Sequence, residues 1–235
     1  MYGLYGFLTN MLMSGKLKFK QGKIEMLGDP MAIVSMDAIK QLTDDAIDRG
    51  SEGINSLYYE GWVYGYTFTY RLVQALNLKK FEDRYTTVMQ IAAMIGFGDF
   101  KTLDYRLGYA KYQVIDNPFP LLYKDSEVKN LKVDHFLRGM NGGGGTVCHN
   151  QLINCVELEC ALKTGRICTF VNANPIELKK LDQNLVKEQL DVTSLLHREM
   201  SLIYSLGHNS SSYEQSLVDA KYSLPPKKQT LKLKQ

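Results

Sequence analysis

The side chains that could do chemistry in this chain gather in one stretch, residues 133–171, which holds all four cysteines. The set also includes acids and histidines, and its members are Cys148, Cys155, Cys160, Cys168, Glu157, Glu159, His135 and His149. Thiolate, carboxylate and imidazole groups together form the ligand set that zinc prefers in proteins. Because the spacing contains no C-x2-C pair, the residues alone leave two interpretations open, a metal site and a group of small buried thiols.

The pattern around the last two cysteines predicts a β-hairpin. Residues 152–159 alternate roughly between two faces, a turn that contains a glycine follows, and a second apolar run would form the returning strand. Cys160 and Cys168 should then face each other across the hairpin. Strict alternation would place Glu157 and Cys160 on opposite faces, so the two can share an ion only if the strand ends or bulges near Glu159.

A long helix is predicted over residues 51–78, and it is unusually rich in aromatic side chains. Gly61 and Gly65 are four residues apart, which leaves one helix face bare and lets another backbone approach closely. Core packing is the simpler interpretation for most of the rings. The functional interpretation is that some of them line an apolar pocket, where phenol groups orient a ligand. The candidates for this pocket are Tyr59, Trp62, Tyr66 and Phe97.

Several of these segments carry a resemblance to a known family. The similar segments are E-x-x-C-A-x-x-x-G-x-x-C at 157–168, HFLRG at 135–139, GFG at 96–98, and YEG at 59–61 followed by Gly65. They resemble the 4-vinyl reductase domain family, which is related to the small subunits of the TRAPP vesicle-tethering complex. The resemblance covers residues 15–174. It implies an α+β domain, with an antiparallel sheet packed on helices, that binds small hydrophobic or aromatic molecules and is often dimeric.

The resemblance also implies a zinc site near the pocket, as many members of the family have. The zinc ligands in those members are a cysteine just before the HFLRG-like segment, the glutamate, and the last two cysteines. Glu157, Cys160 and Cys168 match this pattern, whereas the first cysteine is replaced here by Asp134. An aspartate can bind zinc through a carboxylate oxygen. Three outcomes stay open: a site with Asp134 as the fourth ligand, substitution by another residue, and loss of the site. The alternates are Cys155, Cys148 and His135.

The elements that must position these residues are predicted to form one domain over residues 1–174. With 235 residues and a net charge of +3, the chain is long enough for one large domain and has an ordinary soluble composition. The first 13 residues are apolar and uncharged, and packing on the core is a simpler interpretation than a dimer contact or a membrane-surface anchor. The further predicted elements are a hairpin at 16–28, helices at 31–49 and 81–95, and a strand pair at 97–112.

A run of four glycines, 142–145, follows the predicted start of a helix at 134–140. The run lacks the Gly-Lys-Ser/Thr ending of a phosphate-binding loop. Because glycine is a poor helix former, four in succession should weaken or kink this helix.

The composition changes after residue 174. Residues 175–206 show the apolar spacing of one amphipathic helix, which packs either on its own domain or against a partner protein. Residues 207–235 are predicted to form a flexible basic tail, because the last 15 residues hold five lysines and no acid. Such a tail could contact nucleic acid or an anionic membrane, but only weakly.

The sequence gives little reason to expect an enzyme, because it has no G-x-S-x-G motif, no HExxH motif and no dinucleotide-binding fingerprint. No transmembrane segment or secretion signal is predicted, so we expect a cytoplasmic protein. The first hypothesis is a sensor-type module that binds a small hydrophobic or aromatic molecule, carries a structural zinc ion and forms a homodimer. The alternative is a non-enzymatic dimeric scaffold subunit of a larger protein complex.

Overall fold

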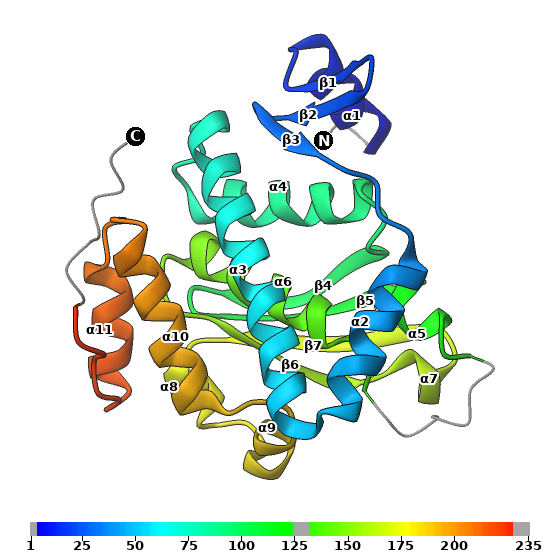
Figure 1. The fold of residues 1–235 in the computed structure, drawn as a ribbon. Helices are drawn as coiled ribbons and strands as arrows, with labels where there is room; N and C mark the ends of the chain where they lie inside the picture. The colour runs from blue at the N-terminus through cyan, green and yellow to red at the C-terminus, as the bar shows by residue number, and fades with distance from the viewer. Residues whose placement is uncertain (1–3, 125–131, 228–235) are drawn as a thin grey trace.

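The computed structural model of the chain describes residues 4–124 and 132–227. Its base is a four-stranded antiparallel sheet with the strand order β4-β5-β7-β6 (Figure 1). The strands are β4 (Asp99–Arg106), β5 (Tyr109–Ile115), β6 (Asn154–Glu159) and β7 (Ile167–Ala173). The predicted strand pair at 97–112 is the β4–β5 hairpin, and its turn contains Gly108 at a φ of 84°. The sequence pattern therefore predicted both hairpins of this sheet, β4–β5 and β6–β7.

Two helices, α3 (Gly50–Leu76) and α6 (His135–His149), cross the sheet one above the other, with α6 between α3 and the strands (Figure 1). The two backbones touch. A Cβ atom at Gly61 or Gly65 would overlap the backbone of α6, and one at Gly139 or Gly143 would overlap the backbone of α3. The close approach predicted from the spacing of Gly61 and Gly65 is thus confirmed, and α6 supplies the matching glycines.

The run of glycines does not interrupt α6, although it was expected to weaken or kink this helix. The helix continues through residues 142–145 to His149, and all four glycines are buried. Each glycine costs about 1 kcal/mol of helix propensity relative to alanine. Tertiary contact overrides this cost, because a side chain at most of these positions would collide with α3, the sheet or their side chains.

The N-terminal residues form a small unit next to α4, away from the four-stranded sheet (Figure 1). The unit contains helix α1 (Leu4–Met13) and a three-stranded sheet of β1 (Leu17–Lys20), β2 (Lys23–Met26) and β3 (Asp29–Met31). Met11, Leu17 and Met26 form its buried core. In the sequence, helix α2 (Met36–Asp48) precedes α3 and helix α4 (Phe81–Met94) follows it. The helix predicted at 31–49 begins only at Met36, because the first of these residues belongs to β3.

The predicted single helix at 175–206 is three helices, α8 (Pro175–Leu178), α9 (Gln183–Gln189) and α10 (Val192–Ser205). Each begins at a new capping side chain, because Asn174, Asp182 and Asp191 each accept a hydrogen bond from a backbone N–H of the helix that follows. The apolar spacing was read correctly, but the caps inside it were missed. All three helices pack on the same domain, because Leu178, Val186 and Leu195 belong to one buried cluster with Trp62.

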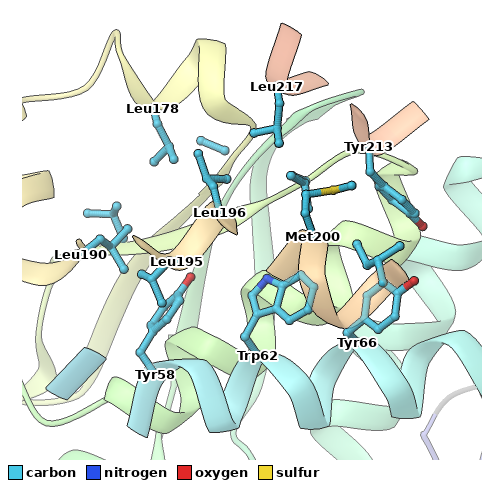
Figure 2. Close-up of a cluster of buried hydrophobic side chains, with 14 of the residues drawn as sticks. Tyr58, Trp62, Tyr66, Leu178, Leu190, Leu195, Leu196, Met200, Tyr213 and Leu217 are labelled. Atoms are coloured by element: carbon cyan, nitrogen blue, oxygen red, sulfur yellow. The ribbon is translucent and has the colours of Figure 1, made fainter. Parts of the chain in front are cut away.

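Helix α11 (Ser211–Asp219) lies in a segment for which the sequence predicted a flexible tail. Tyr213 and Leu217 of this helix are buried beside Tyr66 and Met200, in the cluster shown in Figure 2. The lysines of residues 228–235 lie outside the described residues. Among the helices of the described ranges, none combines the length and the apolar character needed to cross a membrane.

Candidate functional site

Four buried side chains that can bind metals meet at one end of the sheet. Asp134, Glu157, Cys160 and Cys168 each offer one ligand atom, and these atoms all lie within 4.8 Å of one another. Cys160 is 4% exposed and the other three are fully buried. We call these four residues the acid–thiol cluster.

The hairpin and the start of α6 position the acid–thiol cluster. Glu157 lies on β6, Cys160 follows the end of that strand, and Cys168 lies on β7, while Asp134 precedes the first residue of α6. The register between β6 and β7 shifts between Glu157 and Glu159. This is the bulge that the sequence required for Glu157 and Cys160 to lie on one side.

Asn117 holds two members of the cluster together. Its Nδ2 donates to Asp134 Oδ1 over 3.0 Å and lies 3.3 Å from Cys168 Sγ, while its Oδ1 accepts a hydrogen bond from the backbone N–H of Phe119. Asn117 caps the short helix α5 (Pro118–Leu121) and is 1% exposed. No spacing in the sequence marks Asn117 for this role, because an asparagine before a proline is common in turns.

Glu157 is the least satisfied member of the cluster. Neither of its carboxylate oxygens has a hydrogen-bond partner among the described side chains and backbone groups. Burial, and then the negative charge of Asp134, raise the pKa of Glu157 well above its usual value, and the fully buried Arg138 opposes this rise. Burial also raises the pKa of Asp134. Because an unpaired buried carboxylate is costly, these acids need either protons or a cation between them.

The ligand atoms fit a small divalent metal ion that accepts both oxygen and sulfur. Around tetrahedral zinc, ligand atoms at about 2.0 to 2.3 Å from the metal lie about 3.3 to 3.8 Å from one another. The observed limit of 4.8 Å needs only a small inward movement of the side chains. One carboxylate oxygen of Glu157 belongs to this group, and neither of its oxygens has a hydrogen-bond partner among the described residues, so a bound cation would supply a partner that the carboxylate lacks. The cluster could therefore hold a metal ion.

The three alternate ligands lie outside this cluster. Cys155 is buried next to the Tyr112 hydroxyl, 3.5 Å away, and Cys148 lies at a separate cavity described below. His135 Nδ1 is 2.7 Å from an amino group of Arg138, which must be the donor. Burial and the charge of Arg138 lower the pKa of His135 well below its usual value, so its ring is neutral.

A separate cavity, partly open to the surface, lies between α3, α4 and α6. Its volume is about 40 Å³, which is more than one water molecule requires. Its walls are mostly apolar and aromatic, and they include Tyr64 and Phe68 of α3, Tyr85 and Val88 of α4, and Met140 and Cys148 of α6. Gly144 and Gly145 also line it, so the missing side chains of the glycine run leave this space open.

One polar group at the cavity lacks a partner. Asn141 lines the cavity, and its side-chain Nδ2 is buried without a hydrogen-bond partner among the described residues. The backbone oxygen of Asn141 accepts from the Asn172 side chain over 3.0 Å, and Asn172 in turn accepts from the Tyr112 hydroxyl. A buried amide group usually has its hydrogen bonds satisfied, so the free N–H of Asn141 is available to a ligand.

None of the four pocket residues proposed from the sequence lines this cavity. Trp62 and Tyr66 are fully buried on the other side of α3, where they pack against the C-terminal helices (Figure 2). The Tyr59 hydroxyl donates to the backbone oxygen of Arg198, and Phe97 stacks on Phe119. Tyr64 and Phe68 of the same helix line the cavity instead. Aromatic density alone could not tell which face of the helix meets a cavity.

Comparison with known proteins shows the fold. No protein-family model matches the chain, and no curated protein matches it in sequence. Among solved structures, the phenol-responsive sensory domain of the transcription activator PoxR, with phenol, is similar at a TM-score of 0.65 and 16% identity. The match covers 78% of this chain and 96% of that domain. The predicted α+β class, with an antiparallel sheet packed on helices, is confirmed.

A second similar structure is a trafficking protein particle complex subunit 3 from Naegleria fowleri, covalently bound to palmitic acid. Its TM-score is 0.45 at 13% identity, and the match covers 58% of this chain and 90% of that chain. Membership of the 4-vinyl reductase family itself stays a prediction.

Proposed function

We propose that this chain is a sensor-type module that binds a small aromatic or hydrophobic molecule in the cavity between α3, α4 and α6. The observation that carries the proposal is the unpartnered Asn141 Nδ2 at a cavity with mostly apolar walls. Small-molecule sites typically combine apolar walls with a few polar groups that set orientation. The sensory domain of PoxR, which has this fold, is described with phenol bound, and this supports the same class of ligand here.

The shape and chemistry of the cavity restrict the ligand. The space of about 40 Å³ excludes an extended chain, and a single ring would enter only if flexible lining side chains such as Met89 and Met140 moved outward, since a cavity that takes up benzene measures about 150 Å³. Tyr64, Phe68 and Tyr85 offer ring surfaces, and Asn141 offers a hydrogen-bond donor to an oxygen of the ligand. We therefore infer a monocyclic ligand with one oxygen substituent, of which phenol is the simplest member.

We propose that the acid–thiol cluster binds zinc and that its role is structural. The two thiolates favour zinc over magnesium or calcium, which prefer oxygen ligands alone. With all four positions filled by protein side chains, no position would remain for a substrate, which is the arrangement of structural zinc sites. When bound, zinc would supply the positive charge that the buried acids lack. Asp134, Glu157, Cys160 and Cys168 would hold it, with Asn117 orienting Asp134 and Cys168.

Helix α6 connects the two proposed sites. Asp134 immediately precedes its first turn, and Asn141 and Gly144 lie farther along the same helix at the cavity. A metal ion that ties Asp134 to the β6–β7 hairpin would fix the position of α6 against the sheet. The donor of Asn141 would then be held in place before a ligand arrives, which reduces the entropy lost on binding.

The test uses phenol and toluene as probes on the full chain after its metal content has been measured. Phenol should raise the melting temperature progressively, with the logarithm of its concentration above Kd, because it binds the folded state only. In Asn141→Leu, the affinity for phenol should fall about tenfold, the equivalent of one lost hydrogen bond of about 1.4 kcal/mol. The affinity for toluene should change little, because toluene has no oxygen to accept from Asn141.

A control variant, Gly144→Val, adds a side chain at the cavity wall, where a Cβ would meet Thr69 at 3.1 Å and Val88 at 3.8 Å. It should reduce the binding of both probes. If neither probe binds the wild-type chain at millimolar concentration, the proposal of a monocyclic ligand is wrong. Equal losses for phenol and toluene in Asn141→Leu would show that Asn141 does not act as a donor.

A further inference from the structure

Strand β4 is an unusual edge strand, because almost its whole length is exposed. It lies at one end of the strand order, and within the described parts of the chain it pairs only with β5. Seven of its eight residues are exposed, Phe100 being the partly buried exception. Leu103 and Tyr105 are each 45% exposed. An open edge with exposed apolar side chains is a surface on which another strand can pair.

A bulge in β4 sets the faces of its side chains. Thr102 pairs with Tyr112 of β5, but the next pair joins Asp104 to Lys111, so Leu103 has no partner. Opposite residues of an antiparallel pair point to the same face of the sheet. Since Ala110, Tyr112 and Val114 of β5 are buried, the residues opposite them point toward the helices. These residues of β4 are Phe100, Thr102 and Tyr105.

The other face of β4 carries only charged residues outside the bulge. In chain order they are Asp99, Lys101, Asp104 and Arg106, so the charges alternate in sign. Read in the reverse direction, the same row has the opposite charge at every position. An antiparallel copy of β4 would therefore place each charge beside one of opposite sign.

We propose that β4 pairs edge to edge, antiparallel, with β4 of a second copy of this chain around a two-fold axis through the bulge. This register places Asp99 opposite Arg106, and Lys101 opposite Asp104 of the other copy. It also places Phe100 opposite Tyr105 on the face toward the helices. Every pair occurs twice because of the symmetry.

The bulge is what makes this register possible. A two-fold axis perpendicular to the sheet leaves each side chain on its own face. In a regular strand, positions an odd number of residues apart, such as 99 and 106 or 101 and 104, would lie on opposite faces and could not pair. The extra residue in β4 brings them to the same face, so the geometry and the charge order agree.

The charged side chains of β4 make few or only weak ion pairs within their own chain, so they can pair with charges of a second copy. Asp99 and Lys101 have no ion pair within residues 4–124 and 132–227. Arg106 pairs with Asp104 and Glu177, but its side chain is 52% exposed, and exposed ion pairs are weak. The proposed surface also lies close to the ligand cavity. The ring of Tyr85, which lines the cavity, stacks on Tyr105, and its hydroxyl is 3.1 Å from Thr102.

Charge exchange between two variants tests the proposal. In Lys101→Asp alone, two aspartates would face each other at each such pair, and in Asp104→Lys alone, two lysines would. Each variant should weaken self-association of the full chain at least tenfold in sedimentation equilibrium. An equimolar mixture restores opposite charges at both pairs, so it should form a mixed dimer with a Kd within about threefold of the wild-type value.

Each outcome decides the proposal. A wild-type chain that stays monomeric up to about 100 μM would overturn it, and the charges of β4 would then protect an open edge from pairing. A wild-type dimer that both variants form equally well would show that the chain associates through another surface. Failure of the mixture to recover, when both variants melt at the wild-type temperature, would overturn the register.

Discussion

Two fully buried glutamates in this molecule have opposite surroundings. Glu157 lies on β6 among Asp134 and two cysteine thiols, and neither of its oxygens has a hydrogen-bond partner in the described part of the chain. Glu199 lies on α10, and one of its oxygens accepts from the Asn154 side chain over 3.2 Å. Both are 0% exposed. Burial of an acid is therefore common to the two regions, and only the neighbouring groups differ.

The neighbours decide what each acid can do. Around Glu157, further acidic ligands gather that a cation could neutralise together, so this region has the chemistry of a metal site. Among the residues that the structure describes, no other acid or thiol gathers around Glu199. Its hydrogen-bonded neighbour Asn154 also accepts from the Tyr58 hydroxyl, which itself accepts from the backbone N–H of Cys155. Burial raises the pKa of Glu199 to about 8, and the nearby charge of Arg198 only partly opposes this rise, so Glu199 carries a proton at neutral pH. A buried acid alone is no sign of a metal.

Removal of a thiol from the cluster should have the largest effect. Cys168→Ser should lose the metal ion and at least about 3 kcal/mol of unfolding free energy, because the remaining acids stay buried without a cation. Metal analysis and thermal denaturation measure both quantities. Cys148→Ser is the matched control, since Cys148 is equally buried but lies at the cavity. Equal metal content in all three proteins would show that the cluster binds none.

Glu199→Gln should have an effect that depends on pH. The folded pKa of Glu199 is about 8, above the ordinary value of 4.5, so folding takes up a proton between these two values. Wild-type stability from this group is therefore complete below about pH 4.5 and is lost as the pH rises to about 8, by at most about 1.4 kcal/mol per pH unit. Glutamine resembles the protonated acid and does not titrate.

The unfolding free energies of Glu199→Gln and the wild type should therefore be close at pH 5. The variant should become the more stable protein as the pH approaches 8. Urea denaturation at several pH values measures the difference. A constant difference across this range would mean that Glu199 is ionised in the folded protein, and the contrast with Glu157 would fail.

Tyr58→Phe should have the smallest effect. It removes the hydroxyl that joins Asn154 to the backbone N–H of Cys155, which would leave that N–H without its acceptor. The expected loss is about 1 to 2 kcal/mol of unfolding free energy. The metal content should stay at the wild-type value, because Tyr58 contacts none of the four cluster residues through a hydrogen bond in the described structure. A loss of metal would show that the two regions are coupled.

The parts of the fold that depend on local pattern could be predicted from the sequence. The alternation in 152–159 and the glycine-containing turn predicted the hairpin that brings Cys160 to Cys168, and the resemblance added Asp134 to the set. The need for a bulge followed from the positions of Glu157 and Cys160 alone. These features lie within a few residues of one another or at an element boundary, where sequence spacing fixes geometry.

Features that depend on packing between distant segments could not be predicted. Asn117, Arg138 and Asn141 acquire their roles from groups on other elements, and no spacing within the sequence identifies those groups. The difference between the predicted pocket residues and those that line the cavity has the same cause. Trp62 and Tyr64 are two positions apart on one helix, so they face nearly opposite directions, and only the packing of α4 and α10 tells which side has a cavity.

The glycine contact between α3 and α6 limits how this protein can vary. At a metal ligand, one donor can be exchanged for another, as Asp134 in place of a cysteine would illustrate. At Gly143 every genetic replacement adds at least one carbon, and that carbon would overlap the backbone of Trp62. No conservative change exists there, because glycine is already the smallest residue. Mutational drift should therefore alter the side chains around these two helices while leaving their separation unchanged.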